Sequence, residues 1–161
     1  MIGWKDAFVT LGIGTYHAPD NPDDLYIHAV NYPPSETCFN TSTCLPSPRI
    51  EIFLHHLDSD PPSAKHLRTV IHPRIYTPND IISLSPTSFL VSNDHRFPQK
   101  HLRVLEDVVN FSWTSFTDVL RVDASEDEIT VETALDGVHN ANGLAWGSEG
   151  EIVLNDASGG A

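Results

Sequence analysis

Hydrophobic and polar residues alternate along most of this chain with a period of two, which is typical of strands rather than helices. The runs that follow this pattern are bounded by turn residues and cover residues 24–30, 49–54, 66–71, 87–91, 115–122 and 128–132. One segment, Gln99 to Val109, differs because Leu102, Leu105 and Val108 are spaced as on one face of a helix. The pattern therefore predicts an all-β chain with one short surface helix.

The sequence also contains an internal repeat. A strand-like stretch that begins at Asn79 is followed by a turn and a partner strand at 89–94, and the stretch that begins at Asn142 has a similar partner at 152–156. A weaker copy begins at Leu11. Each repeat holds about four short strands, which is the content of one propeller blade. The sequence predicts a single domain over residues 1–161, a partial β-propeller with blades that start near residues 11, 79 and 142.

The first residues of these repeats are candidates for a shared site. The innermost strand of each propeller blade borders the central channel, so the side chains of Leu11, Asn79 and Asn142 are expected to converge there. The amide oxygen of Asn is a good ligand for a hard cation such as calcium. For either Asn taken alone, an Asx turn before the strand is the simpler interpretation. The matched position in two repeats favours an axial cation site.

The two cysteines enclose a glycosylation sequence. Cys38 and Cys44 flank Asn40, which begins an Asn-Thr-Ser triplet, and Asn110 begins an Asn-Phe-Ser triplet. Such triplets also arise by chance, and the spacing of the cysteines fits no zinc knuckle. A triplet inside a short loop between two cysteines is better explained by an oxidised, glycosylated surface loop. We predict a disulfide between Cys38 and Cys44 and glycosylation at Asn40 and Asn110.

The net charge of the chain limits the classes of partner that it is expected to bind. The 161 residues include 22 Asp and Glu against 9 Lys and Arg, for a formal net charge of −13. Such a chain is repelled by phosphate backbones and anionic membrane surfaces, so no nucleic-acid partner is expected. No apolar run approaches the ~20 residues of a membrane span. The first residues lack the features of a signal peptide, so a secreted product would carry its leader outside this chain.

Other catalytic arrangements are poorly represented. Adjacent side chains on a strand face opposite sides, so His55 and His56 cannot chelate one ion together. No H-E-x-x-H motif occurs, and the segment around Trp146 lacks the first glycine of the serine-hydrolase nucleophile elbow. His95 is the candidate catalytic base, because it follows Asp94 at the end of an inner hairpin and this carboxylate can orient its imidazole.

Several of these stretches resemble the serum paraoxonase/arylesterase family. The resemblance is carried by five stretches, in chain order Leu25 to Pro33, Ile50 to Phe53, Asn79-Asp80-Ile81, Asn93-Asp94-His95-Arg96-Phe97 and Ala141 to Leu144. The resemblance extends from Leu11 to Asn155. It implies a six-bladed β-propeller, of which about two and a third blades are present here. It also implies two calcium ions in the central tunnel and hydrolysis of aryl esters and lactones.

The resemblance also implies roles for particular residues. By position, Asn79 and Asn142 correspond to ligands of the family's catalytic calcium ion. Asp80 and the backbone carbonyl of Ile13 correspond to ligands of its structural calcium ion. In the family, an early Glu-Asp pair and a later Asp-Asn pair complete these sites. No such Glu-Asp segment precedes Leu11 here, and the Asp-Asn pair is expected beyond residue 161.

Two positions depart from the family pattern. Leu11 and Tyr32 stand where the family has a pair of histidines that is proposed to transfer protons. Two hypotheses therefore remain. The chain is part of a calcium-dependent hydrolase that acts on small esters and lactones in an extracellular setting, or it is a catalytically degenerate propeller that serves as a binding module or is inactive.

Overall fold

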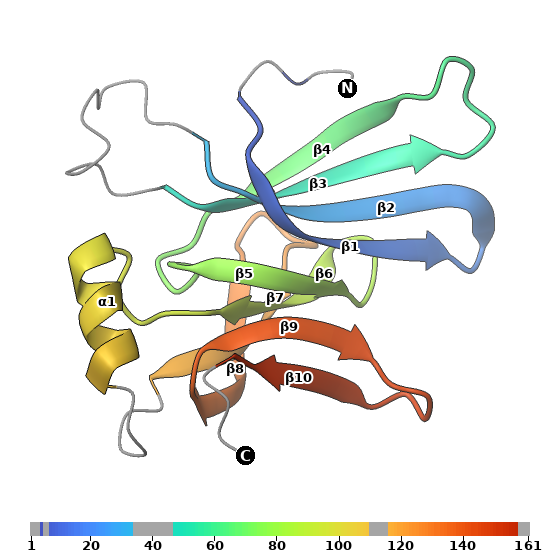
Figure 1. Cartoon of the computed structure of the whole chain (residues 1–161). Helices are drawn as coiled ribbons and strands as arrows, with labels where there is room; N and C mark the ends of the chain where they lie inside the picture. Colours follow the sequence, from blue (N-terminus) through green and yellow to red (C-terminus); the bar gives the residue numbers. More distant parts are fainter. Residues whose placement is uncertain (1–3, 5–6, 34–46, 110–115, 158–161) are drawn as a thin grey trace.

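A computed structural model describes residues 4, 7–33, 47–109 and 116–157 (Figure 1). Within these residues the chain forms three antiparallel sheets and one helix. Sheet 1 consists, in order, of β1 (Thr10–Ala18), β2 (Asn21–Asn31), β3 (Arg49–His56) and β4 (Ala64–Val70). Sheet 2 consists of β5 (Pro78–Ser83), β6 (Ser88–Asn93), β7 (Thr117–Asp123) and β8 (Thr130–Val138). Sheet 3 is the hairpin of β9 (Ala141–Trp146) and β10 (Ile152–Asp156).

Sheets 1 and 2 have the meander arrangement of propeller blades, because each strand pairs antiparallel with the next strand along the chain. Sheet 3 contains the first two strands of the same pattern. The helix α1 (Lys100–Val109) occupies the segment for which helical spacing was predicted. The prediction of an all-β, partial β-propeller is confirmed.

The first strand of each sheet lies at the centre of the arrangement. Figure 1 shows β1, β5 and β9 side by side, with β5 in the middle, and β5 contacts both of the others. These are the strands that begin the three sequence repeats. The structure therefore brings the repeat starts together, as the propeller interpretation predicts.

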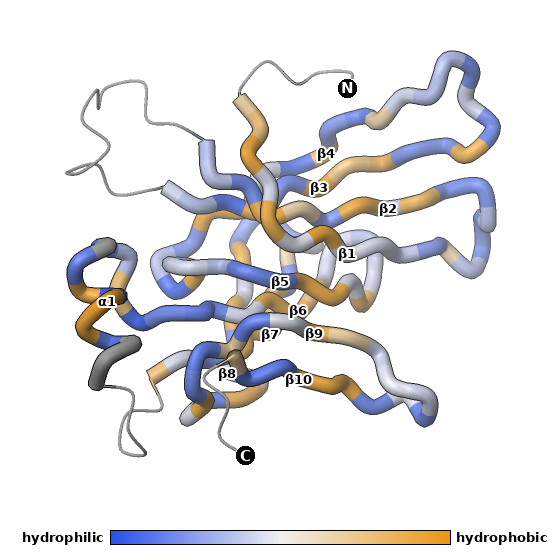
Figure 2. The backbone as a smooth tube through the Cα atoms, in the orientation of Figure 1, coloured by the Kyte–Doolittle hydropathy of each residue, from blue (hydrophilic) through white to orange (hydrophobic). Residues whose placement is uncertain are grey.

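Sheet 2 is covered on both faces, which explains why every residue of β6 and all of β5 except Asn79 and Asp80 are buried. On one face Ile81, Phe89 and Val91 pack against residues of sheet 1 such as Val30 and Ile52. On the other face, a second cluster joins sheet 2 to sheet 3 through Ile82, Leu90, Val119, Ala141, Leu144 and Leu154. Figure 2 shows β5 turn from hydrophilic to hydrophobic colour along its length, and hydrophilic colour at the far ends of the hairpins of sheet 1.

The face of sheet 1 that points away from sheet 2 carries an aromatic cluster. The ring of Trp4 lies 5.9 Å from that of Phe53 and 4.9 Å from that of His66. Phe8 packs edge-on against both Trp4 and Phe53, at 5.8 and 5.9 Å. The segment before β1 thus covers apolar surface on this face.

The predicted disulfide and glycosylation sites lie outside the described residues. Cys38, Cys44, Asn40 and Asn110 all fall in segments that the structure does not describe, so the pairing and both modifications stay predictions. Within the described residues, no helix has the length and apolar character needed to cross a membrane.

Candidate functional site

The carboxylate of Asp80 lies where the three innermost strands meet. Its Oδ2 accepts a hydrogen bond from the backbone N–H of Leu144 in β9 at 2.8 Å, and its Oδ1 accepts one from Ile81 in β5 at 2.9 Å. Strand β1 approaches so closely that a Cβ atom on Gly12 would lie 2.7 Å from Oδ1 and 2.6 Å from the carbonyl oxygen of Asn79. Asp80 therefore contacts all three sheets through β1, β5 and β9.

Two glycines hold the backbone of Ile13 against β5. Besides Gly12, a Cβ atom on Gly14 would lie 2.9 Å from the carbonyl oxygen of Ile81 and 2.8 Å from the Ser83 hydroxyl. The side chain of Ile13 is exposed. The Gly-Ile-Gly sequence has no helix after it and is no phosphate-binding loop; instead it permits a close crossing of strands next to Asp80.

Ser92 connects Asp80 to Asn142. Its buried hydroxyl accepts a hydrogen bond from the backbone N–H of Asp80 at 3.1 Å and donates to the carbonyl oxygen of Asn142 at 2.8 Å. The structure thus places Asn142 beside Asp80 across the boundary of sheets 2 and 3. Sequence reasoning missed Ser92; its one signal is that it directly follows the apolar run Phe89-Leu90-Val91 of β6.

The amide of Asn79 is oriented by a buried carboxylate. Its Nδ2 donates to Oδ2 of Asp94 at 3.0 Å, so its Oδ1 is directed away from that carboxylate. Burial opposes ionisation of Asp94, but the side chains of His95 and Asn79 donate hydrogen bonds to it and Arg103 adds positive charge. Together these interactions hold the pKa of Asp94 below its usual range, so its carboxylate is charged.

His95 lies against the same carboxylate. Its Nδ1 is 3.0 Å from Oδ1 of Asp94, and its side chain is largely buried. The backbone here is held by the buried residue Thr77, whose carbonyl accepts from Asp94 N–H at 3.0 Å and whose hydroxyl accepts from His95 N–H at 3.1 Å. Asp94 and His95 are therefore paired on a fixed segment at the end of the inner hairpin.

Tyr32 and Leu11 occupy the two positions at which the family that this chain resembles has histidines. The hydroxyl of Tyr32 donates to the carbonyl oxygen of Pro78, the residue before Asn79, at 2.8 Å. Burial, aided by the charge of Asp94 and opposed by Arg103, raises the pKa of Tyr32, so it is a neutral donor over the physiological range. The side chain of Leu11 is exposed. Neither residue supplies an imidazole to the site.

The candidate ligand atoms are all oxygens, the type of ligand that calcium prefers. The oxygen donors are the side chains of Asn79, Asp80 and Asn142 and the carbonyl of Ile13, all on β1, β5 and β9. Calcium binds 6–8 oxygen ligands, as a rule with several carboxylates. The described part of the chain contains no group of three or more His, Cys, Asp or Glu side chains placed to hold a metal. In kind, Asn79 and Asn142 fit part of one calcium shell, and Asp80 with the Ile13 carbonyl fits part of a second, for which Asp80 is the carboxylate.

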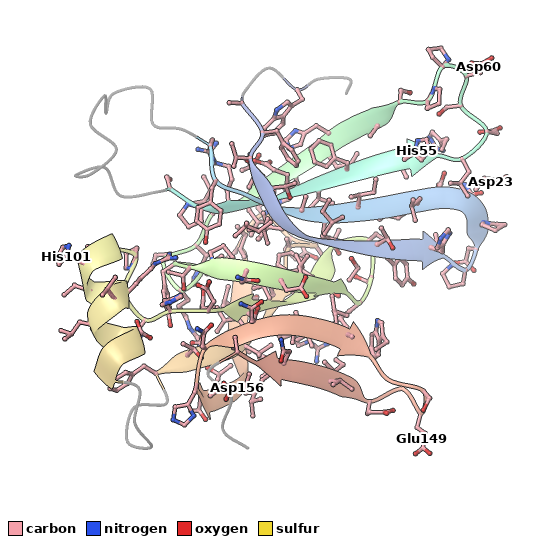
Figure 3. All side chains as sticks on the ribbon, in the orientation of Figure 1. Asp23, His55, Asp60, His101, Glu149 and Asp156 are labelled. Atoms are coloured by element: carbon pink, nitrogen blue, oxygen red, sulfur yellow. The ribbon has the colours of Figure 1, made fainter. Side chains whose placement is uncertain are left out.

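The remaining histidines and acids of sheet 1 lie elsewhere. Figure 3 shows Asp23, His55 and Asp60 at the far ends of the hairpins, away from the meeting point of β1, β5 and β9. The Nδ1 atom of His55 hydrogen-bonds the Ser63 carbonyl at 2.7 Å, whereas His56 pairs with Asp24. The two histidines thus have different partners, in agreement with the prediction that they do not chelate an ion together.

Comparison with known proteins identifies the family. A sequence model of the Arylesterase family matches residues 5–156. The chain belongs to this family. It is 32% identical over 133 residues to serum paraoxonase/arylesterase 2 of Bos taurus, with 83% of this chain and 31% of the relative covered. It is 30% identical over 142 residues to serum paraoxonase/arylesterase 1 of Mus musculus, with coverage of 88% and 34%.

A third relative carries a different name. Serum paraoxonase/lactonase 3 of Rattus norvegicus is 31% identical to this chain over 140 residues, which is 87% of the chain and 33% of the relative. The chain thus spans about a third of the length of the curated relatives it matches. The resemblance described from the sequence motifs is confirmed.

Proposed function

We propose that this chain is part of a calcium-dependent hydrolase of aryl esters and lactones. The observation that carries the proposal is the position of Asp80, whose carboxylate touches β1, β5 and β9 at one point. Asn79, Asn142 and the Ile13 carbonyl lie around it on the same three strands. Oxygen donors that converge from successive blades are what a cation on a propeller axis requires.

In this proposal Asn79 and Asn142 hold the catalytic calcium ion, and Asp80 with the Ile13 carbonyl holds the structural one. Bound calcium supplies Lewis-acid chemistry that polarises an ester carbonyl and stabilises negative charge on its oxygen. Within the chain, Asp94 fixes the Asn79 amide with the oxygen directed away from it. Ser92 sets the distance between the backbones of Asp80 and Asn142.

His95 is the proposed general base. A charged Asp94 beside Nδ1 favours the tautomer with the proton on that nitrogen, which leaves Nε2 as the atom that accepts a proton from water. The same carboxylate stabilises the imidazolium that results. Asp94 thereby links the base to the Asn79 amide on its other oxygen.

The proposed substrates are small neutral esters and lactones, and the proposed location is extracellular. The net charge of −13 disfavours binding to polyanions, so no nucleic-acid partner is proposed. The relatives named above are serum proteins, which supports a secreted protein. The disulfide between Cys38 and Cys44 and glycosylation at Asn40 and Asn110 belong to the same proposal.

Calcium titration of variants tests the site. Because one carboxylate and a few neutral oxygens bind calcium weakly, isothermal calorimetry at millimolar calcium is the measurement. Asp80→Asn, Asn79→Ala and Asn142→Ala should each weaken binding by about tenfold or more, since each removes a donor or its charge. Asn21→Ala is the matched control, because Asn21 is an exposed residue at the far hairpin end of sheet 1. Equal binding by all four variants would contradict the proposed ligands.

One observation favours the alternative of a catalytically degenerate binding module. Tyr32 uses its hydroxyl on a backbone carbonyl and Leu11 is apolar, so the family's histidine dyad has no counterpart in this chain. The two functions share the calcium site and differ in turnover.

A further inference from the structure

A fully buried carboxylate in sheet 1 lies outside the candidate calcium site. Oε2 of Glu51 accepts a hydrogen bond from the Thr69 hydroxyl at 2.6 Å and lies 3.0 Å from Nε2 of His66. Its Oε1 accepts from Nδ2 of Asn31 at 3.3 Å. Burial of a carboxylate is costly unless both oxygens have partners, and here both have them. The Glu51 side chain therefore fixes the orientation of the Asn31 amide.

Asn31, oriented in this way, forms a hydrogen bond with the segment before β1. The residue is fully buried, and with Nδ2 turned to Glu51 its Oδ1 accepts from the backbone N–H of Val9 at 2.9 Å. The carbonyl of Val9 in turn accepts from the backbone N–H of Tyr32 at 2.8 Å. Val9 is thus held at both its backbone groups, one by an Asn31 side chain that Glu51 orients and one by Tyr32.

Tyr32 then reaches sheet 2. Its hydroxyl donates to the Pro78 carbonyl at 2.8 Å, and Pro78 directly precedes Asn79. A continuous series of hydrogen bonds therefore runs from Glu51 through Asn31, Val9 and Tyr32 to the start of β5. It crosses from sheet 1 to sheet 2 next to the candidate calcium ligands.

We propose that Glu51 and Tyr32 are positioning residues, which tether the start of β5, and with it Asn79 and Asp80, to the buried interior of sheet 1. Tyr32 acts on a backbone carbonyl, which is a different task from proton transfer at the same position. That Asn79 and Asp80 hold calcium rests on the proposed function above. The tether itself does not depend on it.

Two variants separate the tether from general fold support. Glu51→Gln keeps the shape but removes the negative charge that strengthens the hydrogen bonds accepted from the Asn31 amide and the Thr69 hydroxyl, so the hold on the Asn31 amide weakens. Tyr32→Phe removes only the hydroxyl from a half-buried ring and keeps its packing, so it should fold even where the first variant does not. Ile52→Val is the control, because Ile52 neighbours Glu51 on β3 but belongs to the apolar core.

Amide hydrogen exchange, read residue by residue, is the measurement. Relative to the core amides of Val91 and Leu120, we expect Glu51→Gln to speed exchange at Val9 and Tyr32 by about tenfold. Tyr32→Phe should speed exchange at Asp80 and Ile81 by a similar factor, also about tenfold, and leave the amide of Val9 unchanged. Ile52→Val should change all of these amides together with the core. The tether would be overturned if, in both test variants, exchange at these amides changed only by the same factor as exchange at the core amides, as we expect in the control.

A calcium titration of the same variants keeps the two proposals distinguishable. Weaker binding in Tyr32→Phe, with faster exchange at Asp80, supports both the tether and the calcium role of β5. Faster exchange with unchanged calcium binding supports the tether and contradicts the assignment of Asn79 and Asp80 as ligands. A Tyr32→Phe variant with unaltered exchange at Asp80 and Ile81 contradicts the tether whatever its calcium affinity.

Discussion

Gly12 determines how closely β1 approaches the candidate site. Any side chain at this position would meet backbone atoms of β5, with the nearest contact to the Asn79 carbonyl oxygen at 2.6 Å. Gly143 also lies near Asp80, but a Cβ atom there would have its closest contact at 3.5 Å, to Asn155, which is ordinary packing. The two glycine positions next to Asp80 therefore differ in whether they have room for a side chain.

We expect Gly12→Ala to destabilise the fold by about 1–3 kcal/mol and to weaken calcium binding, because the added methyl group must push β1 away from β5. Gly143→Ala should be nearly neutral in both respects. Chemical denaturation and calorimetry of the two variants are the measurements. Equal tolerance at the two positions would contradict the close packing of β1 on β5.

His28 is a buried imidazole at the boundary of sheets 1 and 2. Its Nδ1 hydrogen-bonds the Ser83 hydroxyl at 2.8 Å, and its ring packs on Phe89 at 5.2 Å. Burial lowers the pKa of His28 to about 4, and a hydrogen bond to the Pro86 backbone opposes part of that effect. The folded protein therefore holds this imidazole neutral at pH values where the unfolded chain already binds a proton.

Stability should therefore fall as pH decreases from about 6.5 towards about 4, by up to about 3 kcal/mol from this residue. The stability is fully present above that window, since both states are then neutral. Urea denaturation across the window is the measurement, with His28→Gln expected to flatten the dependence. His17→Gln, at an exposed position of β1, should leave the dependence unchanged. If both variants keep the wild-type slope, His28 is not its source.

At the residue scale, the sequence allowed some of the candidate site to be predicted. Asn79 and Asn142 could be proposed because they begin repeats, and Asp80 through the resemblance to the family. The structure brings the backbones of Asp80 and Asn142 together through Ser92. Ser92 and Glu51 could not be proposed, because their roles depend on which strand of another sheet lies opposite them. A buried polar side chain shows in sequence only as an interruption of an apolar run.

At the scale of elements, an arginine joins the outer part of sheet 1 to sheet 2. The guanidinium of Arg68 on β4 donates to three carbonyls of the β7–β8 connection, at 2.7 Å to Ala124, 2.7 Å to Glu126 and 3.1 Å to Asp127. The planar fork of a guanidinium suits several acceptors at once. These bonds hold the two blades together away from the axis.

Arg68→Ala should lower the free energy of unfolding by about 1–2 kcal/mol. This is less than three fully buried hydrogen bonds would contribute, because the acceptors are partly exposed to water. Arg68→Lys should recover little, since an ammonium group cannot span three carbonyls. Arg121→Ala, at an exposed position of β7, is the control and should be close to neutral. Thermal or urea denaturation measures the differences, and full recovery by Arg68→Lys would contradict the multidentate role.

Element positions were predictable where periodicity alone determines them. Strands and α1 follow from their spacing of apolar residues, and short turns predict the pairing of β1 with β2, β3 with β4, β5 with β6, β7 with β8 and β9 with β10. The contact of β5 with β1 and β9 could be expected only through the repeat. The bonds made by Arg68 have no local signal, because their acceptors are backbone carbonyls more than fifty residues away.

At the scale of the whole molecule, three sheets pack side by side with their first strands together, and the proposed oxygen donors come from all three. No single blade holds the site, so its geometry depends on the packing of Ile81, Phe89 and Val91 on one side of sheet 2 and of Ile82 and Leu90 on the other. Two contacts join sheet 1 to sheet 2: the Tyr32 hydrogen bond near the axis, and the hydrogen bonds of Arg68 near the rim. The site is a property of the assembled sheets.

The most direct test of the proposed hydrolase is turnover in a complete propeller. Residues 5–156 of this chain would replace the matching segment of the bovine serum paraoxonase/arylesterase 2, and hydrolysis of phenyl acetate and a simple lactone would be followed with calcium and with chelator. We expect turnover that is lost on chelation and in Asn79→Ala and Asn142→Ala, and retained in Asn21→Ala. A folded chimera that binds calcium but hydrolyses neither substrate would contradict it and favour the binding module.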